Sequence, residues 1–112
     1  KTKEMGLISI PGALTPSEIV QAHEAGADIV KIFPAGILGV EYIKAVRSPL
    51  KHIAMSAVGN ITPENCGGFL KAGCNCIGVG GNLANLESIK NGDFESITDN
   101  ARKYVNAVKI IR

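Results

Sequence analysis

The chain has 112 residues, 46% of them hydrophobic and 20% charged, which is enough apolar material for one compact unit over residues 1–112. The formal net charge of +2 comes from basic and acidic residues scattered along the chain, which argues against a nucleic-acid partner. No apolar run approaches the roughly 20 residues that span a bilayer, and the first residues lack the features of a signal peptide. We therefore expect no membrane partner and a cytoplasmic location.

Short apolar runs alternate with longer amphipathic stretches, a pattern typical of repeated strand–helix units. The runs recur at a regular interval and predict strands over residues 7–10, 29–33, 52–58 and 76–79. Near-continuous apolar runs are typical of parallel strands that are buried on both faces. We therefore expect both faces of the sheet to be covered.

Helix signals lie between these runs. Thr15-Pro16-Ser17-Glu18 combines a hydroxyl N-cap, a proline at the first helical position and a glutamate at the third, and Gly26 ends the predicted helix. Thr62-Pro63-Glu64-Asn65 and Gly73 repeat these signals for a second helix. Further helices are predicted at residues 40–47 and 85–90, and a longer amphipathic helix at residues 94–111 closes the chain.

Four strand–helix units with glycine-rich tips fit either a small open α/β sheet or half of a (β/α)₈ barrel. A complete barrel needs on the order of 200 residues or more, so a chain of 112 residues supplies about half of one.

The predicted second strand contains one charged residue, Lys31. Alternation places Lys31 and Phe33 on one face of this strand and Val30 and Ile32 on the other. One interpretation is a lysine whose stem packs on the sheet while its ammonium reaches water or a carboxylate. The other is a desolvated lysine whose neutral amine attacks a ketone and forms an imine. Pro34 ends the strand at the rim where α/β folds place their chemistry, which favours the second interpretation.

Glycine-rich segments follow the third and fourth predicted strands. They are Val58-Gly59-Asn60-Ile61 and Gly78-Val79-Gly80-Gly81-Asn82. Their backbone N–H groups are suited to hold a phosphate group. Tight strand-to-helix turns also use glycine for steric reasons, so a purely structural role stays open. Ser56 lies near the end of the third strand as a candidate pocket residue, without the motif of a nucleophilic serine.

The cysteines are Cys66, Cys74 and Cys76. An odd number of cysteines among apolar and glycine residues favours free buried thiols. No His or Cys pair stands at zinc-site spacing, so we expect no metal site and no cofactor.

Five ordered motifs resemble the family of 2-keto-3-deoxy-6-phosphogluconate (KDPG) and 2-keto-4-hydroxyglutarate aldolases. They are Ile10-Pro11-Gly12, Thr15-Pro16-Ser17-Glu18, Val30-Lys31-Ile32-Phe33-Pro34-Ala35, Gly59-x-Ile61, and Cys76-Ile77-Gly78 with Gly80-Gly81. The resemblance covers essentially the whole chain. It implies an α/β fold that is the C-terminal half of a (β/α)₈ TIM barrel, with four parallel βα units and a closing helix.

The resemblance also implies a class I aldolase without a metal or cofactor. Such an enzyme cleaves a 2-keto-3-deoxy sugar acid (phosphate), such as 2-dehydro-3-deoxy-6-phosphogluconate or 4-hydroxy-2-oxoglutarate, to pyruvate and an aldehyde. Lys31 matches the Schiff-base lysine of the family. The implied substrate- and phosphate-binding residues are Pro11, Gly12, Phe33, Pro34, Val58, Gly59, Asn60, Gly80, Gly81 and Asn82.

The chain departs from the family pattern in both turns. Ala57-Val58-Gly59-Asn60 stands where the family commonly has Pro-Thr-Gly-Gly, and Gly80-Gly81-Asn82 where it has Gly-Gly-Ser. Without these Thr and Ser hydroxyl groups, the sequence does not determine which substrate binds. A related amino-sugar or an unphosphorylated keto acid is an alternative to the usual sugar acid phosphate.

The family places its proton-transferring Glu and carboxylate-binding Arg in the first half of the barrel, and nothing in this chain replaces them. We therefore expect the 112 residues alone to turn over substrate weakly or not at all. The expected partners are a small keto acid and either further copies, since the family forms trimers, or a missing half-barrel that pairs with the outer strands. The alternative is a non-catalytic half-barrel that binds phosphorylated sugars or serves as an assembly module.

Overall fold

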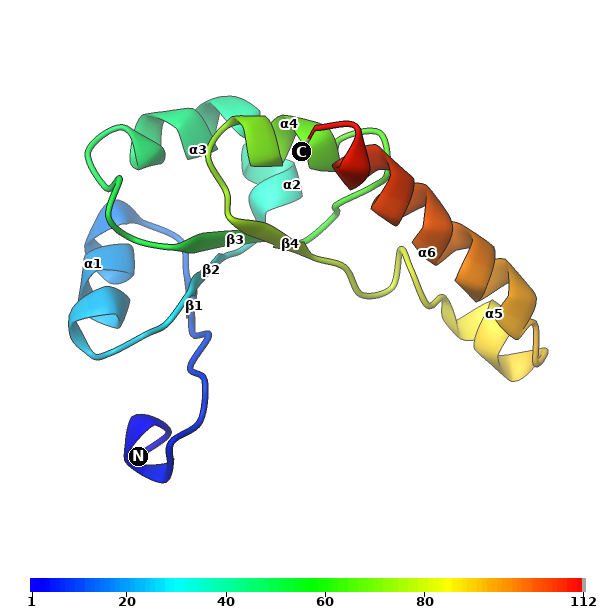
Figure 1. Cartoon of the computed structure of the whole chain (residues 1–112), viewed down its shortest axis with the longest axis horizontal. Coiled ribbons are helices and arrows are strands. Elements are labelled where there is room, and N and C mark those ends of the chain that lie inside the picture. Colours follow the sequence, from blue (N-terminus) through cyan, green and yellow to red (C-terminus); the bar gives the residue numbers. More distant parts are fainter. Residues whose placement is uncertain (112) are drawn as a thin grey trace.

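The chain folds into a four-stranded parallel sheet with helices packed along it (Figure 1). The computed structural model describes residues 1–111. In chain order, its elements are the 3₁₀ turn η1 (Lys3–Met5), β1 (Gly12–Ala13), α1 (Pro16–Glu24), β2 (Val30–Ile32), α2 (Ala35–Leu38), α3 (Val40–Arg47), β3 (Met55–Val58), α4 (Cys66–Lys71), β4 (Cys76–Gly78), α5 (Leu86–Lys90) and α6 (Phe94–Lys109).

The strands lie in the order β1-β2-β3-β4, and each neighbouring pair is parallel. Every connection between successive strands contains at least one helix, as parallel strands require. The predicted α/β class, with four parallel βα units and a closing helix, is confirmed.

One face of the sheet forms the hydrophobic core. Successive strand residues point to opposite faces, so Val30, Ile32, Met55 and Ala57 all point to the same side, and each is fully buried. The buried helix residues that pack against this layer are Ile19 of α1, Ala35 of α2, Ile43 and Val46 of α3, and Phe69 of α4. Full burial of an Ile, Val or Phe side chain contributes about 1.5 to 3 kcal/mol.

The other face of the sheet is open within residues 1–111. The register places Gly12, Lys31, Ser56 and Cys76 side by side in one row across this face. Figure 1 shows α2, α3 and α4 together on the opposite side of the sheet. The cover expected on this second face is therefore not supplied by residues 1–111. The connections between parallel strands share one handedness, so successive strands laid down in one direction carry their helices on the same side.

The first strand was also misplaced in the sequence analysis. Residues 7–10 run beside β2 without forming a strand, and the strand is the Gly12–Ala13 pair that follows. The carbonyl groups of Ser9 and Pro11 accept hydrogen bonds from the N–H groups of Asp28 (2.9 Å) and Lys31 (2.8 Å). Pro11 has no N–H group to donate in return, which interrupts the ladder at this point.

The predicted capping box of α1 is present. The Thr15 hydroxyl accepts a hydrogen bond from the Glu18 N–H group at 3.3 Å, and the Glu18 carboxylate accepts one from the Thr15 N–H group at 2.8 Å. The similar segment before α4 behaves differently. The N–H groups of Thr62 and Asn65 each donate to the other residue's side chain, and these bonds hold a turn, so α4 begins only at Cys66. The short elements η1 and α2 were not predicted.

Candidate active site

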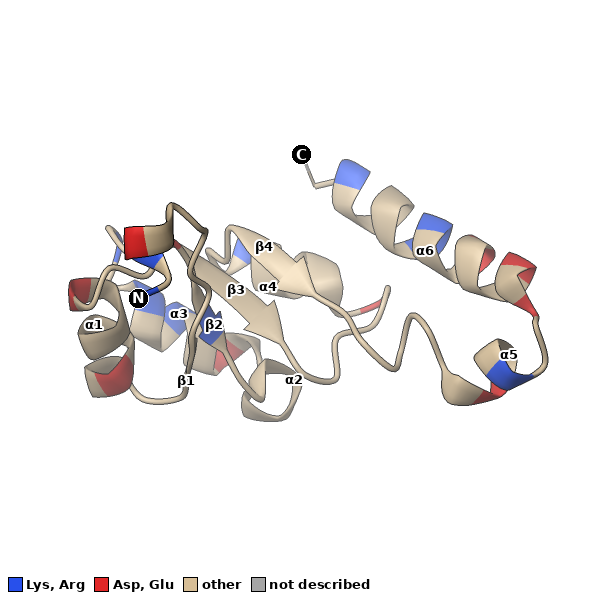
Figure 2. Cartoon of the chain, turned by 90° about the horizontal axis from the view of Figure 1, so that it is seen from below, with Lys and Arg blue, Asp and Glu red and all other residues tan. Residues whose placement is uncertain are grey.

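Lys31 lies on the open face of the sheet, and it is the only charged residue within the strands of the described chain (Figure 2). Its side chain is half-buried, and its Nζ atom lies 5.3 Å from the centroid of the Phe33 ring. Among residues 1–111, the structure shows no ion pair or hydrogen bond of this ammonium group. The structural interpretation is therefore narrowed to an ammonium that reaches water, beside the interpretation as a reactive amine.

Lys31 lines a hollow of about 590 Å³. Gly12, Glu18 and Phe33 are among the other residues that line it. Gly12 lies next to the stem of the lysine side chain. A Cβ atom added at Gly12 would be 3.6 Å from Lys31 Cε. Glu18 uses its carboxylate locally. Hydrogen bonds from the N–H groups of Thr15 and Leu14 lower the pKa of this carboxyl group. The Glu18 carboxylate therefore stabilises the start of α1.

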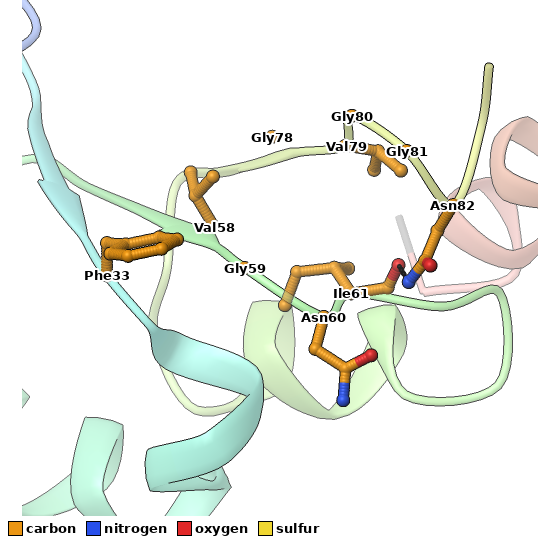
Figure 3. Close-up of a pocket in the computed structure, with 10 residues that line it drawn as sticks. All are labelled: Phe33, Val58, Gly59, Asn60, Ile61, Gly78, Val79, Gly80, Gly81 and Asn82. Carbon is orange, nitrogen blue, oxygen red and sulfur yellow. Dashed lines mark hydrogen bonds between the residues drawn. The ribbon is translucent and has the colours of Figure 1, made fainter. Parts of the chain in front are cut away.

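A second hollow of about 350 Å³ lies between the turns that follow β3 and β4 (Figure 3). It contains seven of the predicted binding residues, namely Phe33, Val58, Gly59, Asn60, Gly80, Gly81 and Asn82. Phe33 lines both hollows, so the lysine and the glycine-containing turns are neighbours at the carboxyl edge of the sheet. This is the edge at which parallel α/β folds bind their ligands.

The turn after β3 needs glycine at its first position. Gly59 has a φ of +96°, and a Cβ atom there would lie 2.9 Å from the Phe33 ring. Asn60 has a φ of +54°, a left-handed conformation that asparagine tolerates better than most residues. Figure 3 shows the Asn60 side chain pointing away from the turn after β4. Asn60 therefore contributes backbone to this hollow.

The turn after β4 is open to solvent. Added Cβ atoms at Gly80 and Gly81 would meet nothing within 4 Å, so a ligand could approach the backbone closely. The Asn82 amide nitrogen donates a hydrogen bond of 3.0 Å to the Ile61 carbonyl and so joins the two turns (Figure 3). Two turns with accessible backbone and a fixed separation are suited to bind a small anion.

Two predicted residues lie behind the site. The Pro11 carbonyl accepts a hydrogen bond from the Lys31 N–H group and aligns β2 with the preceding segment. The Pro34 carbonyl accepts bonds from the N–H groups of Ile37 and Leu38, both at 3.2 Å, and so begins α2. Neither proline lines either hollow. Pro11 lies beside the middle of the lysine strand, and Pro34 follows the end of that strand.

Other residues near the site gave weak or no signals in the sequence. Ser56 is the register partner of Lys31 on the open face and is only 6% exposed. Alternation along the third strand places Ser56 on a defined face, but only the strand register shows that this is the lysine face. Asn100 and Tyr104 of α6 bind the carbonyl groups of the two turns. No sequence pattern indicates these contacts, because they depend on how α6 packs against the sheet.

The cysteines are free, as predicted, with Cys66 and Cys74 buried and Cys76 half-buried. Burial raises the pKa of the Cys74 thiol to about 11. Within residues 1–111 there is no group of three or more His, Cys, Asp or Glu side chains that could hold a metal ion. Over the same residues, none of the helices is both long and apolar enough to cross a membrane.

A parallel βα sheet with an unpaired lysine on one strand, and glycine-containing turns after the next two strands, has the layout of a βα-barrel enzyme site. A sequence model of the family described as KDPG and KHG aldolase matches residues 1–100, and the chain belongs to this family. The site therefore lies in an aldolase fold, and aldolases are lyases.

Individual relatives agree with this assignment. The chain is 44% identical over 79 residues to the 2-dehydro-3-deoxy-6-phosphogalactonate aldolase of Escherichia coli K12, covering 70% of this chain and 38% of that protein. A solved structure titled native KDPGal superposes with a TM-score of 0.90 and 35% identity, covering 97% of this chain and 52% of that one. The four parallel strands thus correspond to part of an aldolase barrel.

A second solved structure is a designed cube-shaped protein cage made by fusing symmetric oligomeric domains. It matches with a TM-score of 0.85 and 36% identity, over 97% of this chain and 39% of that one. Oligomeric assemblies therefore occur among the structural neighbours. The chain spans about half the length of the solved KDPGal structure and less of the E. coli relative.

Proposed function

We propose that this chain is the lysine-bearing C-terminal half of a class I aldolase, with Lys31 as the Schiff-base residue. The substrate would be a 2-keto-3-deoxy sugar acid 6-phosphate, which is cleaved to pyruvate and a three-carbon aldehyde phosphate. The observation that carries this proposal is the unpaired Lys31 ammonium on the open face of the sheet. It lies in a hollow that shares Phe33 with the hollow of the glycine turns.

The proposed reaction begins when the neutral Lys31 amine adds to the C2 ketone of the substrate. The C2 oxygen leaves as water with two protons, so the ammonium and the ketone together give a protonated imine and one water. Loss of the C4 hydroxyl proton then breaks the C3–C4 bond. Its electron pair moves into the C2–C3 bond and is accepted by the imine nitrogen, and C4 becomes an aldehyde. Protonation of C3 and hydrolysis release pyruvate and regenerate the lysine. No residue of this chain is assigned as the base at the C4 hydroxyl.

The two glycine-containing turns are proposed to bind the phosphate. Their backbone N–H groups remain available as donors although Val58 and Asn82 lack the hydroxyl groups common in the family. Backbone amides in such turns form concave anion sites. The 44% identity to the E. coli phosphogalactonate enzyme supports 2-dehydro-3-deoxy-6-phosphogalactonate as the first substrate to test.

Assembly is proposed to complete the barrel. The sheet leaves β1 and β4 as edge strands, and exposed parallel edges favour pairing with further chain. Either a second half-barrel or further copies of the chain would cover them. A location in the cytoplasm would suit an aldolase of sugar-acid metabolism.

Reductive trapping with the sugar acid itself tests this function. The chain is incubated with 2-dehydro-3-deoxy-6-phosphogalactonate or 2-dehydro-3-deoxy-6-phosphogluconate in the presence of borohydride, and its intact mass is measured. A reduced pyruvyl adduct at Lys31 would show both imine formation and C3–C4 cleavage. An adduct of the whole sugar acid would show imine formation without cleavage. Binding of the sugar phosphate without any adduct would favour the non-catalytic alternative and contradict the proposal.

A further inference from the structure

Two side chains on one face of α6 each hold one of the glycine-containing turns. The Asn100 amide nitrogen donates to the carbonyl oxygens of Asn82 (2.6 Å) and Leu83 (3.4 Å) in the turn after β4. The Tyr104 hydroxyl donates to the Ile61 carbonyl (2.8 Å) at the end of the turn after β3. Residues four positions apart lie on the same face of a helix, so a single helix contacts both turns.

A third hydrogen bond closes this network. The Asn82 amide nitrogen donates to the same Ile61 carbonyl, at 3.0 Å, that accepts the bond from Tyr104. Tyr104 is only 6% exposed and its bond to Ile61 is buried, so water competes weakly for that bond, whereas the bond from Asn100 to Asn82 is exposed. Asn82 lines the hollow between the two turns, whereas Asn100 and Tyr104 hold the turns from outside it.

We propose that Asn100 and Tyr104 are positioning residues for the phosphate site, an inference that rests on the function proposed above. Backbone donors from two separate turns bind one anion well only if their spacing is already correct, because reorganisation lowers affinity. The packing of α6 sets this spacing. Loosening either contact should weaken the binding of phosphate much more than it affects imine formation at Lys31.

Titration of the full chain with inorganic phosphate tests the inference. Binding is followed through the amide NMR signals of Gly80 and Gly81. Asn100→Asp keeps the size of the side chain but removes its donor, and we expect the Kd for phosphate to rise about tenfold. Asn106→Asp makes the same charge change at an exposed position of α6 and should alter the Kd less than twofold. Tyr104→Phe removes only the hydroxyl group and should raise the Kd about threefold.

Pyruvate trapping at Lys31 is measured on the same samples. We expect its rate to change less than twofold in Asn100→Asp, a split that general unfolding would not produce. An unchanged Kd in Asn100→Asp and Tyr104→Phe would overturn the inference, as would equal weakening in Asn100→Asp and Asn106→Asp. If the unmodified chain traps pyruvate but does not bind phosphate, this inference and the proposed phosphate site both fail, while the role of Lys31 stands.

Discussion

Lys31 and Phe33 lie on the same face of the lysine strand, with the Lys31 Nζ atom 5.3 Å from the centroid of the Phe33 ring. The ring also lines both hollows of the site, and a Cβ atom added at Gly59 would lie 2.9 Å from it. One aromatic side chain therefore borders both the amine and the turn after β3.

Replacing this ring should slow imine formation. In Phe33→Ala the amine loses the surface that holds it in position, and we expect the rate of pyruvate trapping to fall about tenfold, because small displacements of a reacting group are costly. Phe33→Leu keeps an apolar wall and should show a smaller loss. Stopped-time borohydride trapping with mass detection measures both rates. Equal rates in Phe33→Ala and the unmodified chain would show that the ring has no positioning role.

Gly59→Ala should destabilise the chain and damage the turn after β3. A φ of +96° is unfavourable for alanine, and its Cβ atom would lie 2.9 Å from the Phe33 ring. We expect a loss of about 2 kcal/mol in the free energy of unfolding, measured by urea denaturation. Gly80→Ala is the matched control, since a Cβ atom there meets nothing within 4 Å. Similar stability of the two variants would contradict this account of the turn.

The capping box of α1 should make stability depend on pH. Hydrogen bonds from Thr15 and Leu14 lower the pKa of the Glu18 carboxyl group in the folded chain. Its contribution is therefore fully present above the unfolded pKa of about 4.3 and is lost as the pH falls through the lower folded value. We expect the stability difference between the unmodified chain and Glu18→Gln to be largest near neutral pH and to shrink in acid. A difference that is constant from pH 7 to pH 2 would refute the assignment.

The exposed edges of the sheet should make the chain associate with further copies of itself. Size-exclusion chromatography with light scattering is expected to give a mass above the 11.7 kDa of one chain. Ile8 is 73% exposed beside the β1 edge, so Ile8→Lys should weaken association. Ile37 is 77% exposed but lies in α2, and Ile37→Lys should leave association unchanged. A stable monomer that turns over substrate rapidly would contradict both the expected association and the expected weak turnover.

The sequence predicted the parts of the fold that depend on local signals. The Thr15–Glu18 capping box and the alternation around Lys31 depend on neighbouring residues, and both are present. The first strand was misplaced because residues 7–10 have β-forming side chains, whereas strand pairing depends on whether Pro11 can donate a hydrogen bond. A ladder of hydrogen bonds requires suitable donors and acceptors on both strands, so the composition of one segment cannot determine whether it forms.

Some residues of the candidate site could likewise be predicted from local sequence patterns, and others could not. Lys31 and the glycine turns are visible in the sequence because a charge in an apolar strand and clustered glycines are local anomalies. Their closeness follows from the parallel order of the strands. Asn100 and Tyr104 reach the turns across 18 and 43 positions of the chain, so no local pattern could identify them.

Borohydride trapping with pyruvate tests the central claim most directly. After reduction and proteolysis, mass spectrometry should find a reduced pyruvyl group on Lys31. Lys31→Arg should abolish the adduct, because a guanidinium group stays protonated and cannot act as the nucleophile. Lys44→Arg is the matched control, since Lys44 pairs with Glu41 on the surface of α3, and this variant should be trapped normally. A folded sample that gives no adduct, or an adduct that persists in Lys31→Arg, would contradict the assignment of Lys31 as the Schiff-base residue.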